Sequence, residues 1–434
     1  MAASLFFSLD LSYSPIIVAM MLALKIVAVF LVAVYAEQNP FDGDKVFRIT
    51  PKTDAEVKLL KEFLGKLKNV DAWQEPSVAG NTADVHVAAH SVAVTEAFLE
   101  KNGYEYGYLI DNLGSALDAE EASNVQNAFA SSFNYERYNT YRDIAGELFN
   151  LARQYKNAET FFVGNTYERR RMVGLKVVAP GSTSPKPAIW IDGGIHAREW
   201  ISPATVMYFL NKLLTSGDSR AKQVLDMYDF YFLPVFNPDG YEYTHKSRRT
   251  RLWRKTRSNQ GWGCYGADPN RNWGYKWEVP VGTSRNPCSD IYRGRNAFSE
   301  IEVKNVANYL QNKVPNLKMY FNVHAYSQLI LTPFSYTTDY PEDYPEIKRV
   351  ADVFVSAVES RYGTYYKAGP PSRILYAVAG GSIDWTYAVL GVKYSYALEL
   401  RDRGEYGFVL PTDQIKPTGE ETSDAWFASI LAMK

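Results

Sequence analysis

The feature that most constrains the fold is a regular alternation of segment types from about Phe133 to the C-terminus. The strand-like apolar runs are VGLKVVA, PAIWIDGGIHA, DFYFLPVFN, MYFNVHAYS and KYSYALEL. Amphipathic helical patterns lie between them at 201–215, 299–313, 344–362 and 418–433, the second with Ser299 and Glu302 as a predicted capping box. Such alternation is typical of an α/β sheet with helices on both faces. We therefore expect residues 133–434 to form one α/β domain.

A smaller alternation precedes this region and predicts a separate α+β domain within residues 37–114. Its order is strand, helix, strand, helix, strand, carried by KVFRIT, TDAEVKLLKEFLGKL, ADVHVAA, SVAVTEAFLEKNG and YEYGYLI. The first helix begins with a capping box, Thr53 and Glu56, and its apolar face consists of Val57, Leu60, Phe63, Leu64 and Leu67. Residues 115–132 are small, polar and acidic, which indicates a linker or an exposed connecting helix at the domain boundary.

The N-terminal stretch 16–36 is apolar except for Lys25, and a polar run follows it. Two interpretations compete, a cleaved signal peptide and a membrane anchor long enough to span a bilayer. We favour a signal peptide over residues 1–36, because Lys25 splits the stretch and Ala33-Val34-Tyr35-Ala36 offers a small-residue cleavage site. A start at Met20 or Met21 gives a more compact signal. The expectation is a secreted, extracellular protein without a stable membrane anchor.

Composition excludes one class of partner and suggests one covalent link. Lys and Arg (47) nearly balance Asp and Glu (48), so the formal charge of -1 provides no global field for nucleic acid. The chain has two cysteines, Cys264 and Cys288, which are expected to pair after export; the alternative is two free thiols.

Histidine is scarce, with five in the chain, and two of them follow apolar strands. His196 ends AIWIDGGIH with Glu199 three residues later, and His324 ends MYFNVH. Ligands gather at the carboxyl ends of strands in open α/β sheets, so these three side chains are candidates for one metal site with an open fourth position. The other histidines have no comparable context: we expect His86 and His90 to be ordinary surface or half-buried residues, and His245 to be an ordinary residue of its polar, basic loop.

A series of sequence motifs supports the interpretation of His196, Glu199 and His324 as metal ligands. HAREWISPA, NPDGYEYTH, RLWRKTRS, NRNW, HAYSQLIL, GGSIDW and ELRDRGEYGF occur in this order. From about Phe133 onward the chain resembles the zinc metallocarboxypeptidases of the pancreatic A/B type, and the small preceding domain resembles the inhibitory pro-segment of that family. The resemblance implies a mixed eight-stranded twisted sheet flanked by helices, preceded by a ferredoxin-like pro-domain. It also implies a zymogen that removes C-terminal residues from peptides.

Specific roles follow from the resemblance, residue by residue. It makes His196, Glu199 and His324 the ligands of one Zn²⁺ ion and Glu399 the general base. Arg254 stabilises the oxyanion, and Asp268 holds a zinc-bound imidazole from outside. The peptide terminus is held by the residues Asn270, Arg271 and Tyr376, and the next subsite is lined by Arg198, Tyr326 and Phe408.

Ile383, in GGSIDW, matches the floor of the specificity pocket and predicts a preference for aromatic or aliphatic C-terminal residues. The adjacent Asp384 points elsewhere in the family pattern. Ala397 is smaller than the threonine often found at its position, which favours bulkier side chains.

One feature departs from the family pattern. Between Lys101 and Arg137 the chain has no lysine or arginine, so trypsin cannot cut within residues 115–132. Two routes of activation remain: a protease other than trypsin cuts within the acidic stretch LDAEEASN, or a cut at Lys101 is followed by trimming. Two other functions compete, a non-catalytic peptide-binding relative and a zinc hydrolase for another carboxylate-bearing amide. The presence of every expected ligand, base and arginine argues against the first, and assays separate the second.

Overall fold

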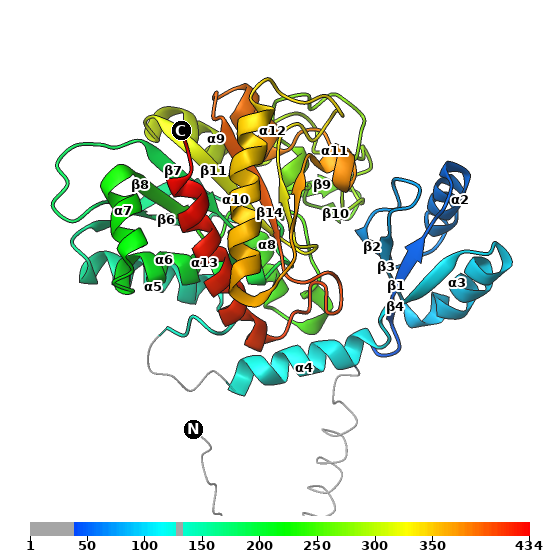
Figure 1. Cartoon of the computed structure of the whole chain (residues 1–434). Helices are drawn as coiled ribbons and strands as arrows, with labels where there is room; N and C mark the ends of the chain where they lie inside the picture. The colour runs from blue at the N-terminus through cyan, green and yellow to red at the C-terminus, as the bar shows by residue number, and fades with distance from the viewer. Residues whose placement is uncertain (1–38, 127–132) are drawn as a thin grey trace, which may run out of the picture.

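The computed structural model describes residues 39–126 and 133–434, which form an N-terminal unit and a C-terminal unit (Figure 1). We use the name N-terminal unit for residues 39–110 and C-terminal unit for residues 133–434. The predicted signal peptide, 1–36, and the end of the predicted linker, 127–132, lie outside the described residues. No helix in the described part of the chain is both long and apolar enough to cross a membrane.

The N-terminal unit contains four strands and two helices in the order β1, α2, β2, β3, α3, β4. Their bounds are β1 Lys45–Thr50, α2 Asp54–Leu64, β2 Val70–Gln74, β3 Ala83–Val87, α3 Ala89–Lys101 and β4 Glu105–Ile110. The sheet order is β2-β3-β1-β4 with every neighbouring pair antiparallel, which is the ferredoxin-like arrangement that was expected. Strand β2 is a correction, because the sequence pattern did not predict a strand here.

The local sequence explains the first helix of this unit. The Thr53 side chain accepts a hydrogen bond from the Glu56 N–H at 3.2 Å, which satisfies one of the free donors at the helix start. The Glu56 carboxylate accepts from the N–H of Lys52, not from that of Thr53, so only half of the predicted capping box forms. Val57, Leu60 and Leu64 are buried on the predicted apolar face.

A connecting helix, α4 (Leu113–Gln126), joins the two units (Figure 1). Leu113 and Leu117 are buried in the same apolar cluster as the C-terminal unit. The segment that reads from sequence as a linker or a connecting helix is therefore helical as far as Gln126. It packs on the C-terminal unit with its leucines.

The C-terminal unit is built on an eight-stranded mixed sheet in the order β13-β12-β14-β11-β7-β8-β6-β5. The strand bounds are β5 Ala158–Asn165, β6 Arg171–Val177, β7 Ala188–Asp192, β8 Asp229–Leu233, β11 Leu317–Ala325, β12 Leu329–Leu331, β13 Lys367–Gly369 and β14 Tyr394–Leu400. The four central strands β14, β11, β7 and β8 run parallel to one another. These four strands and β6 are the strands that the apolar runs predicted, whereas the peripheral strands β5, β12 and β13 were not predicted.

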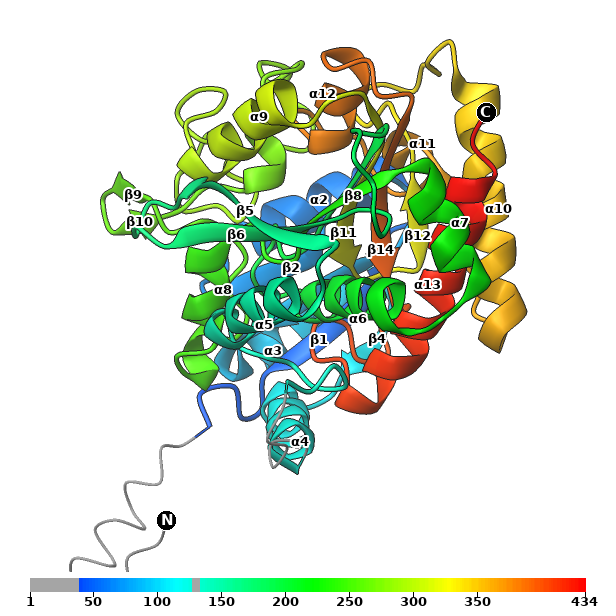
Figure 2. The same ribbon diagram turned by 90° about the vertical axis from the view of Figure 1, so that its left-hand side faces the viewer.

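Helices cover both faces of this sheet, as the alternation predicted. On one face lie α5 (Tyr141–Gln154), α6 (Ile201–Thr215), α7 (Ser219–Met227), α10 (Tyr344–Tyr362) and α13 (Ile415–Leu431). On the other face lie α9 (Ile301–Lys313) and α12 (Ser382–Ala388), and Figure 2 shows the two groups on opposite sides of the strands. Each face carries its own apolar core, which fixes the strand ends rigidly in place.

One helix start differs from its prediction. Helix α9 has Glu300 at its N-cap without a side-chain capping bond, so the capping box predicted at Ser299 and Glu302 is wrong. Glu302 is buried instead, and its carboxylate accepts the N–H of Tyr167 at 2.9 Å. The Glu302 side chain, which the local pattern assigned to the helix end, therefore makes a tertiary contact instead.

The long connections of the C-terminal unit contain short elements. These are α8 Pro238–Thr244, η2 Arg248–Thr250, β9 Asn259–Gly261, β10 Cys264–Tyr265, η3 Pro269–Arg271, α11 Pro371–Ile374 and η4 Thr412–Gln414. The predicted disulfide is present between Cys264 and Cys288, which are 24 residues apart. It closes the connection that leads into and out of η3.

Candidate active site

The site forms where the central parallel strands end. The loop after β7 carries His196 and Glu199, and the last residues of β11 and β14 carry His324 and Glu399. His324 and Glu399 are direct neighbours in the register of these two strands. Parallel strands bring their carboxyl ends to one edge, so residues far apart in the sequence meet there.

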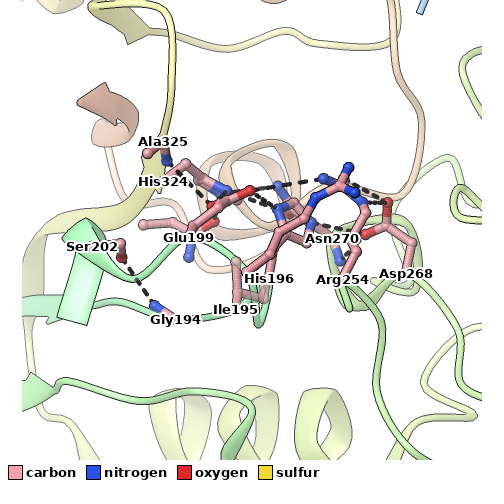
Figure 3. A network of polar contacts seen from close by, with 12 residues as sticks. Gly194, Ile195, His196, Glu199, Ser202, Arg254, Asp268, Asn270, His324 and Ala325 are labelled. Atoms are coloured by element: carbon pink, nitrogen blue, oxygen red, sulfur yellow. Dashed lines mark hydrogen bonds and ion pairs between the residues drawn. The ribbon is translucent and has the colours of Figure 1, made fainter. Parts of the chain in front are cut away.

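Three buried side chains converge on one point. The Nδ1 atom of His196 is 2.8 Å from Glu199 Oε1, and the Nδ1 atom of His324 is 3.2 Å from Glu199 Oε2. The two Nδ1 atoms are 3.1 Å apart, and all three residues are 3% exposed or less. Figure 3 shows the three groups pointing toward one another. Two imidazole nitrogens and a carboxylate in this arrangement fit a divalent metal ion.

Asp268 supports this cluster from outside. Its Oδ1 atom is 3.0 Å from His196 Nε2, and its Oδ2 atom accepts from Arg254 Nη2 at 2.8 Å (Figure 3). Burial opposes ionisation of Asp268, but Arg254 and Arg271 outweigh it and hold the pKa of this carboxyl well below its usual range. An ionised Asp268 accepts the Nε2 proton of His196, which leaves Nδ1 free to bind a cation.

The two central acids differ in their ionisation. Burial opposes the charged form of Glu199, but His196 and His324 outweigh it and hold its pKa below the ordinary value. Burial raises the pKa of Glu399 to about 7, and His324 opposes this rise. Glu199 is therefore suited to bind a cation and Glu399 to exchange a proton near neutral pH.

Two further predicted residues lie next to the cluster. Asn270 Nδ2 is 3.3 Å from His324 Nε2, and its Oδ1 atom accepts the Ser382 N–H at 2.9 Å. The Arg271 guanidinium is held by two backbone carbonyls, those of Gly282 at 2.8 Å and Asn270 at 3.0 Å. Both side chains are thus fixed in place beside the candidate ligands.

These groups line one cavity, together with side chains from several loops. Of the predicted site residues, the cavity wall includes His196, Glu199, Arg254, Asn270, Arg271, His324, Tyr326, Tyr376, Ile383, Glu399 and Phe408. Its volume is about 80 Å³. Ordinary ligand pockets measure roughly 300–1,000 Å³, so little room remains in this state.

One end of the cavity is mainly apolar. Its wall is formed by Leu331, Leu375, Val378, Ile383 and Ala397, with Ser335 and Ser382 as polar members. Asp384 does not line the cavity, because its carboxylate accepts the N–H groups of Ser335 (2.8 Å) and Tyr336 (3.3 Å). Burial raises the pKa of Asp384 to about 7.

The N-terminal unit occupies the entrance of the cavity, which explains its small volume. Trp73 and Gln74 of β2 line the cavity directly. The Trp73 ring is 4.9 Å from the Phe408 ring and 6.4 Å from the Tyr326 ring, measured between centroids. An aromatic side chain from another unit therefore blocks the entrance.

Carboxylates of the N-terminal unit hold the predicted subsite residues. Asp71 Oδ2 accepts from Arg198 Nη1 at 2.5 Å, and Asp84 Oδ2 accepts from the Tyr326 hydroxyl at 2.7 Å. Arg198 does not line the cavity; its guanidinium lies 4.2 Å from the centroid of the Phe408 ring. The two units are thus joined at the mouth of the site.

The sequence pattern does not predict these contacts of β2, which include those of Asp71 and Trp73. A signal was available, because Trp73 is the sole tryptophan in residues 45–114, which are otherwise unremarkable in composition. The local pattern of VDAWQ does not reveal which chain segment faces it. Of the remaining histidines, His90 is exposed as expected, and His245 is half-buried with its ring stacked on Trp200, centroids 4.1 Å apart. His86 is a correction, because it is buried and contacts Asp44 at 2.8 Å.

Comparisons with known proteins agree with this geometry. Residues 144–425 match the family described as zinc carboxypeptidase, and residues 47–120 match the carboxypeptidase activation peptide. Fold and site together define a metal-dependent carboxypeptidase with its activation peptide attached. The chain belongs to the zinc carboxypeptidase family.

Relatives extend over nearly the whole chain. Carboxypeptidase A2 of Rattus norvegicus is 39% identical over 393 residues, which cover 89% of this chain and 92% of the relative. Carboxypeptidase B of Rattus norvegicus is 40% identical over 412 residues, covering 93% and 96%. The crystal structure of thrombin activatable fibrinolysis inhibitor aligns with a TM-score of 0.83 and 35% identity, covering 90% of this chain and 98% of that one. The protein is accordingly a zinc-dependent carboxypeptidase made as a zymogen.

Proposed function

We propose that the chain removes aromatic or aliphatic residues from peptide C-termini, with Glu399 as the general base. The observation that carries the proposal is the convergence of His196, Glu199 and His324 beside Glu399 in one cavity with an apolar end. Each residue role below belongs to this proposal.

The donor set fits zinc. His196 and His324 present their Nδ1 atoms, while the Nε2 atom of each ring has its own partner, Asp268 or Asn322. Both rings are thereby held in the tautomer that a metal requires. When bound, Zn²⁺ supplies a Lewis acid that polarises a carbonyl and lowers the pKa of water.

Proton transfer falls to Glu399. This carboxylate removes a proton from the attacking water and delivers it to the leaving amine, for which a pKa near neutrality is suitable. Arg254 provides positive charge where the carbonyl oxygen becomes negative. Its charge is secure, because Asp268 and Glu199 overcome the effect of burial and keep the pKa of Arg254 above its ordinary value.

The peptide terminus is held by Arg271 and Asn270, with Tyr376 closing the site. A guanidinium offers two parallel N–H donors to a carboxylate, which makes it suited to a free C-terminus. The backbone bonds of Arg271 fix that fork next to the candidate metal ligands. A peptide without a free carboxylate lacks this anchor.

The pocket around Ile383 and Ala397 sets the preference. Both are buried and apolar, and the nearby Asp384 is engaged with backbone N–H groups. Relatives of both the A and the B type match this chain at similar identity, so the pocket itself supports the preference. An apolar pocket desolvates an aromatic side chain at low cost and a lysine at high cost.

The test uses matched short peptides that end in Phe, Leu or Lys, with and without a zinc chelator. We expect cleavage of the Phe and Leu peptides, loss of activity with the chelator and at least tenfold weaker cleavage of the Lys peptide. The variant Ile383→Asp should reverse the order, and Ile383→Val is the matched control. Cleavage of Lys in preference to Phe would overturn the pocket argument. Activity that survives full zinc removal would overturn the mechanism.

The proposal divides the chain into functional parts. Residues 1–36 are a signal peptide removed on secretion, 37–114 an inhibitory activation peptide, 115–132 the segment that is cut, and 133–434 the catalytic domain. The contacts of Asp71, Trp73 and Asp84 at the cavity mouth support inhibition within the molecule.

Activation is proposed to use either another protease in the acidic stretch LDAEEASN or a cut at Lys101 with later trimming, and trypsin alone should not produce the mature N-terminus. The stretch from Asn102 to Glu136 offers trypsin no lysine or arginine, and Arg137 lies next to Tyr138, whose hydroxyl is bonded to Leu410 O at 2.7 Å. Treating the intact chain with trypsin should leave no new N-terminus within residues 115–132. N-terminal sequencing decides this, and a tryptic cut inside that window contradicts it.

A further inference from the structure

A buried asparagine, Asn322, lies behind the candidate ligands and contacts more than the His324 ring. Asn322 lies two residues before His324 on β11, so both side chains point to the same face of the sheet. In the strand register Asn322 pairs with Asp192 of β7 on one side and with Ala397 of β14 on the other. It therefore sits where the strand of a metal ligand meets the wall of the specificity pocket.

The hydrogen bonds of Asn322 fix its orientation. Its Nδ2 atom donates to Asp192 Oδ1, and Asp192 Oδ2 already accepts from Trp190 Nε1 at 2.7 Å. Asn322 and Asp192 are both fully buried, so no water competes for these atoms. With Nδ2 facing a carboxylate, the carbonyl oxygen Oδ1 of Asn322 must face the other way.

That oxygen contacts His324 at the nitrogen that does not face the metal site. Because Oδ1 can only accept, His324 Nε2 carries the proton, and Nδ1 presents its lone pair toward Glu199. The Nδ2 atom of Asn270 also lies 3.3 Å from His324 Nε2. An amide NH₂ group cannot accept a hydrogen bond, so this longer contact does not compete with Oδ1 of Asn322 as the acceptor. Asn322 thus decides the tautomer of His324.

The same oxygen reaches the specificity pocket. Ser382 Oγ donates to Asn322 Oδ1 at 3.2 Å, and Ser382 is the first residue of α12, directly before Ile383. The backbone N–H of Ser382 is held by Asn270. One carboxamide oxygen therefore ties the metal-binding imidazole to the helix that carries the pocket floor.

We propose that Asn322 is a positioning residue that couples zinc retention to the shape of the specificity pocket. This inference rests on the proposed function, because it takes the ligand set and the pocket from there. The two candidate histidine ligands are supported differently: His196 by the carboxylate of Asp268, and His324 by a carboxamide backed by Asp192. An apolar side chain at position 322 leaves the Oδ1 atom of Asp192 without the Asn322 donor and the His324 tautomer unfixed.

The test compares the zinc-loaded variants Asn322→Leu and Asn322→Ser with the unaltered chain. The first readout is the rate of zinc transfer to a chromogenic chelator, which requires no catalysis. We expect release about 10- to 100-fold faster for Asn322→Leu and a smaller acceleration for Asn322→Ser, whose hydroxyl can still accept a hydrogen bond. Asn139→Ser, a buried asparagine that bonds the carbonyls of Asn134 and Arg137, is the matched control.

Two further readouts separate positioning from general destabilisation. A structural role lowers the unfolding temperature of the zinc-loaded and zinc-free proteins equally, whereas a positioning role reduces the difference between them. The coupling predicts that the KM for Phe peptides rises in Asn322→Ser more than kcat falls. Zinc release at the unaltered rate in both variants overturns the inference. If the unaltered, zinc-loaded chain cleaves no peptide, the proposed function is refuted. The zinc-release rates of the two variants still test the role of Asn322 in that case.

Discussion

The two units of the molecule meet with opposite charges. The N-terminal unit and helix α4 contribute carboxylates, whereas the C-terminal unit contributes guanidinium groups and a phenol. The pairs are Asp71 with Arg198, Asp84 with Tyr326, and Glu120 with Arg251. Each C-terminal partner is 6% exposed or less, so removal of the N-terminal unit exposes buried polar groups at the cavity mouth.

The difference between the units shows how chemistry and inhibition are divided. The C-terminal unit assembles its site from three strand ends between two apolar cores, one of which also includes Val46, Trp73 and Ile110 of the N-terminal unit. The N-terminal unit contributes none of the candidate ligands and acts through strand β2 and the acids around it. Catalysis and inhibition should therefore respond to different substitutions.

The largest expected effect breaks catalysis and leaves the contact between the units intact. Replacing Glu399 by Gln removes the group that exchanges the proton, and we expect kcat in the cleaved enzyme to fall about 1,000-fold. Glu359→Gln on the exposed side of α10 is the control. Steady-state kinetics with a Phe peptide provide the measurement, and a loss below tenfold would exclude Glu399 as the base.

The next effect breaks inhibition and leaves catalysis intact. Asp71→Asn leaves the buried guanidinium of Arg198 without its charged partner, which costs roughly 3 kcal/mol, or about a 100-fold weaker inhibition. The activity of the intact, uncut chain should rise accordingly, while the cleaved enzyme keeps its kinetics. The exposed Asp54→Asn is the control. An uncut Asp71→Asn chain that stays fully inhibited contradicts the comparison.

A third prediction concerns pH. The Oδ1 atom of Asp71 is buried, and the carboxyl of Asp290 in the C-terminal unit lies against Asp71 as its hydrogen-bond neighbour. Burial and then Asp71 raise the pKa of Asp290 to about 7, while Arg198 and Lys255 oppose the rise. Protonated Asp290 can donate to Asp71; ionised Asp290 repels it.

The raised pKa of Asp290 predicts that inhibition by the N-terminal unit weakens as the pH rises. The proton that stabilises the contact is present at low pH and is lost as the pH rises toward 7, so inhibition should weaken by up to about tenfold per pH unit and become constant above about pH 7. Because Arg198, together with His86, lowers the pKa of Asp71 against the effect of burial, that carboxylate stays ionised over this range. The ratio of intact to cleaved activity measures the effect and cancels the titration of the catalytic groups. Asp290→Asn should remove the pH dependence, and an unchanged slope in that variant contradicts it.

The smallest expected effect tests whether burial sets the strength of the charge pairs. Glu121 pairs with Arg248 at 2.7 Å in an exposed position, whereas the neighbouring Glu120 pairs with Arg251 in a buried one. Glu121→Gln should change inhibition less than threefold, and Glu120→Gln should change it at least tenfold. Equal effects of the two substitutions would show that burial is irrelevant here.

The sequence predicted the parts of the fold that rest on repeating local patterns. The central strands and helices α6 and α10 have their predicted places, because apolar periodicity reflects one buried face. The strands β2, β5, β12 and β13 escaped prediction. They are short or peripheral, and their pairing depends on neighbours distant in the chain. Glu302 was assigned to a helix cap and is instead bonded to a distant backbone.

By itself, the sequence determined the family, the expected ligand set and the absence of basic residues between Lys101 and Arg137. Sequence motifs carry this information, because each motif contains its functional residues within a few positions of the chain. Only the tertiary structure decided that Trp73 closes the cavity, that Asp71 holds Arg198, and that Asn322 joins His324 to Ser382. These contacts connect residues that local spacing does not relate, and they form because separate strands and units pack against one another.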